Sequence, residues 1–158
     1  MKILFVCHGN ICRSPMAEFI MKHLIKQAGV SERFTISSAA TTTEELGNDI
    51  YPNAKAELKR HGIPFEHRRV RQIRGNEDWD LIIAMDHENL NDIRSIYPEK
   101  KVKLLMSFAG EEKSVSDPWY TRDFARAYND IHRGCEGLLR NLVEKDAEWK
   151  EGKCNVVV

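Results

Sequence analysis

The sequence has no hydrophobic run long enough for a secretory signal or a membrane-spanning helix. Its N-terminal apolar run, residues 3–6, follows a single lysine and ends at Cys7, far short of the roughly 20 apolar residues that a span requires. The chain also lacks an excess of charge of either sign, because 24 lysines and arginines balance 24 aspartates and glutamates. This balance gives no electrostatic reason to expect a nucleic acid or an anionic membrane as a partner. We therefore expect a cytoplasmic protein that binds neither.

Cysteine is scarce as well. The four cysteines, at positions 7, 12, 135 and 154, have neither the paired spacing of a zinc site nor the density of a secreted disulfide scaffold. The six histidines show no ligand spacing either. We expect a reduced, intracellular chain that needs no metal and no other cofactor.

Internal repeats and linker-like segments are also missing. The 158 residues suffice for one domain with a substantial core. We therefore expect a single domain over residues 1–158, in which residues 145–158 form a tail whose structure the sequence does not indicate.

Apolar runs of strand length alternate with segments of helical period. This order predicts an α/β fold with a parallel sheet covered by helices on both faces, which makes three layers with ligands at the carboxyl ends of the strands. Ser14 is the expected N-cap of the first helix, with Pro15 as its first residue and Glu18 in its first turn. The predicted strands are residues 2–6, 34–39, 81–85 and 102–105, and the predicted helices are residues 15–28, 53–61, 87–96 and 123–144.

The segment between the first strand and the first helix predicts an anion site. Cys7 ends the strand, Arg13 stands at the helix start, and the permissive Gly9 between them lets the backbone aim successive N–H groups at one point. A helix N-terminus favours phosphate and its mimics. The same N–H groups, with Arg13 and the Ser14 hydroxyl, favour the thiolate, so we expect Cys7 to be an ionised nucleophile.

A proton donor is needed if phosphate is to pass from an ester oxygen to sulfur. Asp117 is the candidate, since Pro118 stiffens its loop and Trp119 and Tyr120 can wall an apolar mouth. Asp86 competes for this role, but its position directly before a helix favours an N-cap. The basic cluster of residues 68, 69, 71 and 74 is interpreted as a solvated surface rather than a phosphate or acidic-peptide site.

Four separated motifs resemble those of the low-molecular-weight protein tyrosine phosphatases. They are residues 7–18, the run 38–41, residues 84–86 with Asn89 and Leu90, and residues 117–120. The resemblance extends from residue 1 to about residue 142. It implies a four-stranded parallel sheet with a phosphate-binding loop after the first strand, and a metal-free hydrolysis through a phosphocysteine.

The resemblance also implies roles for individual residues. Cys7 is the nucleophile, Arg13 the phosphate clamp, and Asp117 the acid that later activates water. Cys12 matches a loop cysteine that can form a reversible disulfide with Cys7, although a packing role without redox function is an equal alternative. Tyr120 matches a tyrosine that is phosphorylated in relatives, or is simply an aromatic wall. The remaining residues expected to bind phosphate or substrate are His8, Gly9, Asn10, Ile11, Cys12, Ser14, Glu44, Trp119 and Tyr120.

Two positions depart from the family pattern. Glu44 stands where the family usually has an aromatic wall of the substrate cleft, and a carboxylate there repels acidic flanking sequence. Arg122 stands where many members have glycine. The departure at Glu44 bears on substrate preference more than on reaction type.

The expected partner is a phosphotyrosine-containing protein or a small aryl phosphate, with inorganic phosphate as product, and the chain is expected to be a monomer or a weak homodimer. A phosphoarginine phosphatase on the same scaffold is the alternative, although the bulk of Ile11 favours a flat phenolic ester. An arsenate reductase is a further alternative, but the cysteine relay that it requires is not evident. A phosphate-binding module without catalytic activity is a third alternative, but simple binding has no use for the proton donor Asp117.

Overall fold

The computed structural model of the chain describes residues 1–98 and 101–150. Strands and helices alternate as predicted, and the four strands form one parallel sheet in the order β2-β1-β3-β4. This confirms the predicted α/β fold. The elements are β1 (Lys2–Cys7), α1 (Arg13–Gln27), η1 (Ser31–Arg33), β2 (Thr35–Ala40), α2 (Pro52–Arg60), β3 (Leu81–Ala84), α3 (His87–Arg94), β4 (Val102–Leu104), η3 (Leu105–Ala109), α4 (Pro118–Thr121) and α5 (Phe124–Lys150).

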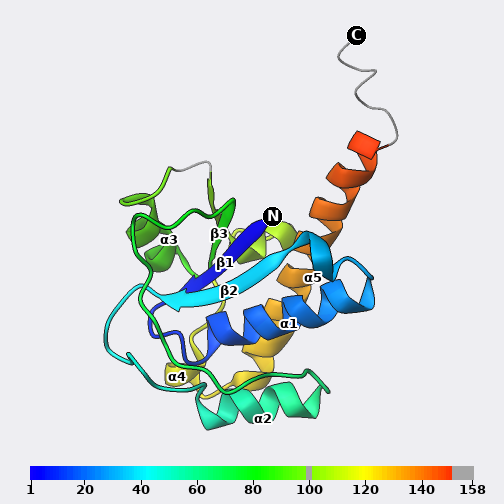
Figure 1. Cartoon of the computed structure of the whole chain (residues 1–158). Helices are drawn as coiled ribbons and strands as arrows, with labels where there is room; N and C mark the ends of the chain where they lie inside the picture. Colours follow the sequence, from blue (N-terminus) through cyan, green and yellow to red (C-terminus); the bar gives the residue numbers. More distant parts are fainter. Residues whose placement is uncertain (99–100, 151–158) are drawn as a thin grey trace.

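Helices cover both faces of the sheet, with α1 and α5 on one face and α3 on the other (Figure 1). Side chains of β1 alternate between the two faces because the strand has a period of two. Ile3 and Phe5 pack into the core under α1 and α5, whereas Leu4 and Val6 pack into the core under α3. All four side chains have no exposed surface, so β1 is a central strand buried on both sides.

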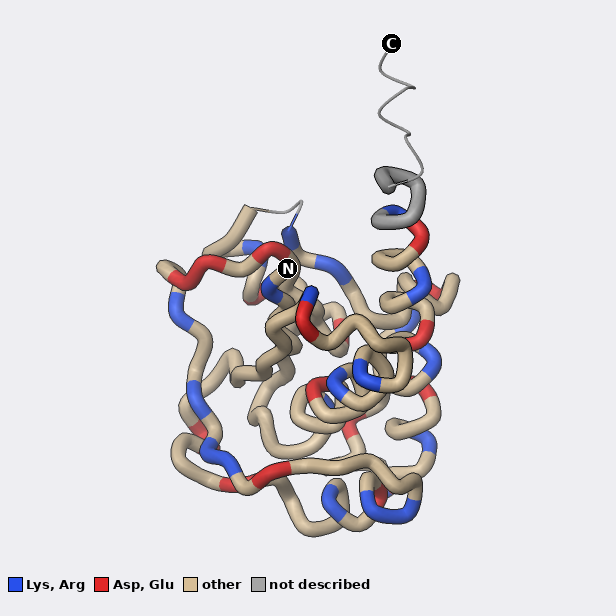
Figure 2. Tube along the Cα trace, turned by 45° about the vertical axis from the view of Figure 1, so that its right-hand side comes forward, with Lys and Arg blue, Asp and Glu red and all other residues tan. Residues whose placement is uncertain are grey.

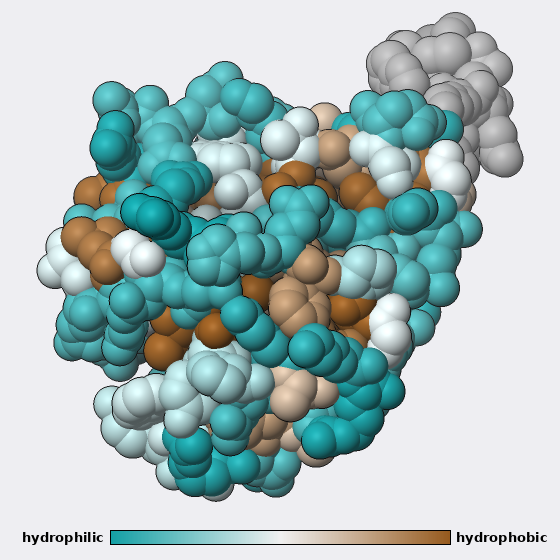
Figure 3. All heavy atoms as spheres, turned by 60° about the horizontal axis from the view of Figure 1, so that its bottom comes forward, coloured by the Kyte–Doolittle hydropathy of each residue, from teal (hydrophilic) through white to brown (hydrophobic). Residues whose placement is uncertain are grey.

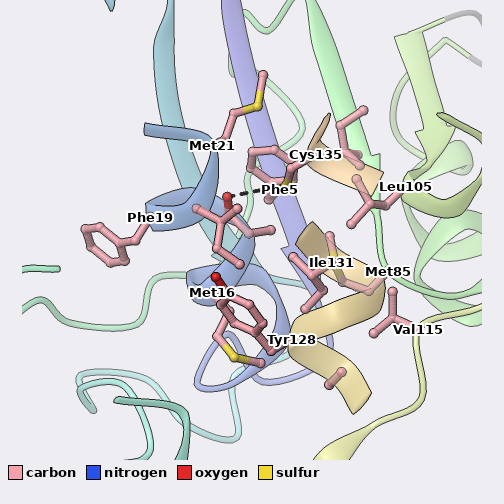
Figure 4. Close-up of a cluster of buried hydrophobic side chains, with 14 of the residues drawn as sticks. Phe5, Met16, Phe19, Met21, Met85, Leu105, Val115, Tyr128, Ile131 and Cys135 are labelled. Atoms are coloured by element: carbon pink, nitrogen blue, oxygen red, sulfur yellow. Dashed lines mark hydrogen bonds between the residues drawn. The ribbon is translucent and has the colours of Figure 1, made fainter. Parts of the chain in front are cut away.

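The core between the sheet, α1 and α5 is the larger of the two. Figure 4 shows Met16 and Met21 of α1 and Ile131 of α5 near Phe5 of β1. Cys135 of α5 is fully buried in this core, and its Sγ lies 3.8 Å from the carbonyl oxygen of Ala17. The apolar residues of α5 in this core, among them Ile131, Cys135 and Leu138, form the face of the helix that packs against the sheet and α1.

Two glycines let α5 lie close to η3. A Cβ atom at Gly137 would stand 2.0 Å from the carbonyl oxygen of Phe108, and one at Gly134 would stand 2.6 Å from the side chain of Leu105. No larger residue fits at Gly137 without a shift of backbone, because the obstacle is main chain. The close approach of α5 to the end of the sheet depends on this position.

The start of α1 differs from the prediction. The helix begins at Arg13, so Pro15 is its third residue and Cys12 is the N-cap, which makes no side-chain cap bond. Ser14 is therefore not the N-cap, because its hydroxyl is used inside the phosphate-binding loop. Glu18 lies beyond the first turn, where its carboxylate accepts hydrogen bonds from Ser38 and Lys22.

The surface is polar and carries both signs of charge. Lysine and arginine are interspersed with aspartate and glutamate along the chain trace (Figure 2). The face that comes forward in Figure 3, which includes the lower side of Figure 1, is mostly hydrophilic with smaller apolar groups between. None of the helices in the described ranges combines the length and the apolar character needed to cross a membrane. The last helix continues to Lys150, farther than predicted, while residues 151–158, with Cys154, lie outside the described residues.

Candidate active site

Cys7 lies at the carboxyl end of β1, beneath the loop of residues 8–12, and is almost fully buried. The backbone N–H groups of Asn10 and Ser14 point at its Sγ, with N···S distances of 3.3 and 3.5 Å. The Oγ of Ser14 lies 3.0 Å from the same sulfur. A sulfur surrounded by donors in this way sits in a site built for negative charge.

The turn of the loop is made at Asn10 rather than at Gly9. Asn10 has φ 58°, in the left-handed region that non-glycine residues seldom occupy, whereas Gly9 does not have a positive φ. The Asn10 side chain is buried and donates from Nδ2 to Ser14 Oγ at 2.6 Å. This bond holds the strained residue and orients the serine hydroxyl toward Cys7, which is why the sequence has asparagine at this point.

Arg68 supports the loop from behind, which corrects the prediction that the whole basic cluster is solvated. Its guanidinium donates to the carbonyl oxygen of Asn10 at 2.6 Å, while its Nε and one terminal nitrogen are buried without a partner among the described groups. Burial lowers the pKa of Arg68. The backbone N–H of Arg68 is held at 3.2 Å by Asp49, so the segment behind the loop is fixed at two points.

Arg13 is the first residue of α1, and its side chain is only 3% exposed. One terminal nitrogen donates to Asp86 Oδ2 at 2.7 Å and to the carbonyl oxygen of Val115 at 3.0 Å, and the other lies 3.4 Å from Asp117 Oδ2. Burial works against the charged form, but the negative charges of Cys7 and Asp117 and the bond to Asp86 together raise the pKa of Arg13. The guanidinium is thus a fixed cation beside the Cys7 sulfur.

Two aspartates meet at this arginine, and the sequence identified a function for each but not their shared partner. Asp117 accepts a hydrogen bond from the backbone N–H of Trp119 at 3.0 Å through Oδ1 and caps α4, which leaves Oδ2 toward Arg13. Asp86 is the N-cap of α3 as predicted, accepting from the Asn89 N–H at 2.8 Å, and its other oxygen binds Arg13. That both carboxylates converge on one guanidinium is visible only once the strand ends are aligned in space.

One cleft opens above these groups, with a volume of about 70 Å³. Its lining includes Glu44, whose Oε2 lies 2.8 Å from His8 Nε2, and the exposed residues Trp119 and Tyr120. Ser14 is not part of the lining but contacts Cys7, which is, and Glu45, which the sequence did not single out, belongs to the lining. The lining comprises Cys7, His8, Gly9, Asn10, Ile11, Cys12, Arg13, Glu44, Glu45, Asp117, Trp119 and Tyr120.

Cys12 also borders the cleft. Burial, with the nearby Cys7 and Asp117, raises the pKa of the Cys12 thiol far above its ordinary value. Cys12 is therefore a neutral thiol at neutral pH. Within the described residues, Cys7, Cys12 and Cys135 are all free cysteines.

Four of the six histidines pair with single carboxylates. The ring nitrogens of His8, His61, His67 and His132 lie 2.8 to 3.1 Å from the oxygen of one glutamate or aspartate each. In residues 1–98 and 101–150, no group of three or more histidine, cysteine, aspartate or glutamate side chains is placed to hold a metal ion. The groups assembled in the cleft are the Cys7 sulfur, the Arg13 guanidinium and the Asp117 carboxyl.

Comparison with known proteins agrees with this geometry. The model of the low molecular weight phosphotyrosine protein phosphatase family matches residues 2–148. The low molecular weight protein-tyrosine-phosphatase PtpA of Staphylococcus aureus is 38% identical over 153 residues, which is 95% of this chain and 98% of the relative.

Solved structures have the same fold. YfkJ from Bacillus subtilis superimposes with a TM-score of 0.88 at 35% identity, covering 92% of this chain and 96% of that one. An arginine phosphatase from Drosophila superimposes with a TM-score of 0.82 at 33% identity, covering 90% of this chain and 98% of that one. The resemblance found in four short motifs therefore extends over nearly the whole chain.

Proposed function

The chain belongs to the low molecular weight phosphotyrosine protein phosphatase family, and from this premise we propose that it hydrolyses phosphotyrosine through a phosphocysteine formed on Cys7. As a member it is a protein-tyrosine phosphatase, an enzyme that acts on phosphomonoesters. The observation that carries the proposed mechanism is the position of Cys7 Sγ, which lies among three donors at the base of a cleft that also holds Arg13 and Asp117.

In the first step the Cys7 thiolate attacks phosphorus. Its lone pair forms the S–P bond while the bond from phosphorus to the phenolic oxygen breaks. The Ser14 hydroxyl and the two N–H groups stabilise the thiolate before attack. Arg13 binds two of the three equatorial phosphoryl oxygens through its planar fork, which matches their geometry in the transition state.

Asp117 supplies the proton that the phenolic oxygen needs as it leaves. Oδ1 is used by the Trp119 N–H, so Oδ2, the oxygen that faces Arg13 and the cleft, is the one that donates. The bound phosphate replaces Asp117 as the partner of the Arg13 terminal nitrogen that lies 3.4 Å from Asp117 Oδ2. Proton donation is worth most for a leaving group that is a strong base, such as the phenolate of tyrosine.

Water then releases the phosphate. The Asp117 carboxylate accepts a proton from a water molecule, whose oxygen attacks phosphorus while the S–P bond breaks. The products are inorganic phosphate and the Cys7 thiolate. Asp117 ends the cycle protonated, ready for the next substrate.

Two features of the cleft favour an aromatic phosphoester in a protein. The rings of Trp119 and Tyr120 stand at the mouth, 44% and 80% exposed, where they can pack against a phenyl ring. Ile11 adds an apolar surface to the lining. Phosphoarginine is the second candidate, because the Drosophila arginine phosphatase has the same fold at 33% identity and the carboxylates of Glu44 and Glu45 can face a guanidinium group.

Arsenate reduction is a weaker candidate, since it requires further cysteines to relay a disulfide. Cys135 lies on α5 and is enclosed in the hydrophobic core, and burial raises the pKa of its thiol. Cys154 lies outside the described residues. Cys12 is the one described cysteine besides Cys7 that borders the cleft.

One preparation assayed with phosphotyrosine, phosphoarginine and arsenate separates these functions. We expect turnover of phosphotyrosine with the highest kcat/KM, and loss of that turnover in Cys7→Ser with phosphate binding retained. Turnover of an aryl phosphate by Cys7→Ser at the original rate would contradict the covalent mechanism. A higher kcat/KM for phosphoarginine would reassign the substrate but leave the mechanism intact.

A further inference from the structure

Arg122 has a backbone conformation that normally belongs to glycine. It follows α4 directly with φ 60° and ψ 14°, and its N–H closes the helix by donating to the carbonyl oxygen of Pro118 at 2.9 Å. A side chain in this left-handed region carries a steric cost that glycine avoids. A non-glycine residue keeps such a conformation only where the surrounding contacts compensate for its cost.

The Arg122 side chain lies among three aromatic rings. Its guanidinium carbon is 5.4 Å from the ring centre of Tyr51, 5.9 Å from that of Trp119 and 5.5 Å from that of Phe124. One terminal nitrogen donates to the Tyr51 hydroxyl at 2.9 Å. These distances fit cation–π contacts, so the arginine joins residues from three separate segments.

The rings also contact one another. Tyr51 and Trp119 meet edge to face with centres 5.1 Å apart, and Tyr51 and Phe124 stack with centres 5.9 Å apart. We refer to Arg122, Tyr51, Trp119 and Phe124 as the Arg122 cluster. Trp119 belongs to α4, the helix that Asp117 caps, so the cluster holds the helix on which the acid depends.

Tyr51 connects the cluster to the phosphate-binding loop. Its backbone N–H donates to the carbonyl oxygen of Ile11 at 2.9 Å, and it is the N-cap residue of α2. A continuous set of contacts therefore runs from the phosphate-binding loop through Tyr51 and Arg122 to α4. This set fixes the distance between the loop that holds phosphate and the loop that carries the acid.

We propose that Arg122 is a positioning residue that holds the acid loop against the phosphate-binding loop, so that Asp117 stays within reach of the leaving oxygen. The proposal rests on the proposed role of Asp117 as the general acid. Arg122 itself does not touch the reacting atoms, since it is absent from the cleft lining. Its effect on rate is therefore an effect on how well Asp117 donates.

Arg122→Gly is the informative substitution, because glycine adopts the same backbone without strain while every contact of the side chain is lost. We expect kcat/KM for phenyl phosphate, whose leaving group needs a proton, to fall about tenfold, a part of the 10²- to 10⁴-fold that general acid catalysis supplies. With p-nitrophenyl phosphate, whose leaving group departs readily as an anion, kcat/KM should change much less. These two rate constants exclude the later release of phosphate by water, in which Asp117 also acts.

Two further variants isolate the cause. Tyr51→Phe removes only the hydroxyl that accepts a hydrogen bond from Arg122. It should change the ratio of kcat/KM for phenyl phosphate to that for p-nitrophenyl phosphate in the same direction as Arg122→Gly, but by a smaller factor. Arg126→Ala removes a positive charge from an exposed side chain in the first turn of α5 and should leave both rates unchanged. This control separates the position of Arg122 from loss of charge.

The double variant Asp117→Asn with Arg122→Gly tests whether the two residues act together. We expect Arg122→Gly to have no further selective effect on phenyl phosphate once Asp117 is replaced. One outcome overturns the positioning role but leaves the proposed mechanism standing. In it, Asp117→Asn selectively slows phenyl phosphate, whereas Arg122→Gly lowers kcat/KM for both substrates equally or for neither. If Asp117→Asn itself slows both substrates equally, the acid role of Asp117 is wrong and the proposal for Arg122 falls with it.

Discussion

Asp86 should stabilise the fold chiefly through its bond to Arg13, and this contribution can be separated from its N-cap. One carboxylate oxygen accepts from Arg13 at 2.7 Å, and the other accepts from the Asn89 N–H at 2.8 Å. The Arg13 side chain is 3% exposed and that of Asp86 21%, so water cannot readily replace the lost bond. Asp86→Ser keeps a hydroxyl that can cap α3 but is too short to reach the guanidinium.

Hydrogen bonds to buried charged groups contribute about 1.5–3 kcal/mol, so Asp86→Ser should lower the free energy of unfolding by about that amount. Asp86→Ala should cost about 1 kcal/mol more, because it also removes the cap. Urea unfolding with an unchanged m-value measures both effects. Asp92→Ser, the same substitution at an exposed site on α3, is the control and should stay within about 0.5 kcal/mol of the parent. If Asp86→Ser were as stable as Asp92→Ser, the Arg13 bond would contribute nothing.

Other predictions concern packing, charge and pH. Gly137→Ala should lower the free energy of unfolding by about 1–3 kcal/mol. The loss should exceed that of Gly134→Ala, because the new Cβ at position 137 meets the Phe108 carbonyl and the one at position 134 meets the flexible side chain of Leu105. Equal losses of stability in thermal unfolding would contradict the packing argument. Glu44→Lys should raise kcat/KM for phosphotyrosine peptides with acidic flanking residues relative to peptides with basic ones, and added salt should weaken this effect. If the ratio of kcat/KM for the two kinds of peptide does not change, Glu44 has no part in substrate specificity. At Asp49, burial opposes the charge, but hydrogen bonds from neighbouring side chains and backbone outweigh it and lower the pKa well below its usual range. The stabilisation by the Asp49 carboxylate is thus complete above pH ~4 and is lost as pH falls. Asp49→Asn should therefore lower the free energy of unfolding at neutral pH and make its decrease toward acid pH shallower, as measured by urea unfolding at a series of pH values. Curves of unfolding free energy against pH that run parallel for the variant and the parent would refute this.

The fold was predictable because the local signals agreed with one another. Apolar runs marked the four strands within one or two residues. The first two long helices end within two residues of Gly29 and Gly62, both with positive φ, close to the predicted ends at residues 28 and 61. The N-cap of α3 at Asp86 was likewise evident from its place between a buried strand and a helix. These features depend on neighbours in the chain, which the sequence displays directly.

The errors at the site arise where tertiary contacts override local preference. Ser14 has the chemistry of an N-cap, but its hydroxyl bonds Cys7 and Asn10 instead. Gly9 is the residue that local rules place in a left-handed turn, yet buried bonds hold Asn10 there. Arg68 belongs to a basic run with the composition of a solvated surface, and only the fold shows that its guanidinium is partly buried against the phosphate-binding loop.

Formation of a phosphocysteine on Cys7 is the central claim, and trapping the enzyme during turnover tests it most directly. The protein is mixed with an aryl phosphate and quenched within one turnover, and its peptides are then analysed by mass spectrometry. We expect one phosphoryl group on the peptide that contains Cys7, and more of it in Asp117→Asn with p-nitrophenyl phosphate, since release by water is slowed more than attack. Full turnover with no phosphoryl group on Cys7, or with the group on another residue, would contradict it.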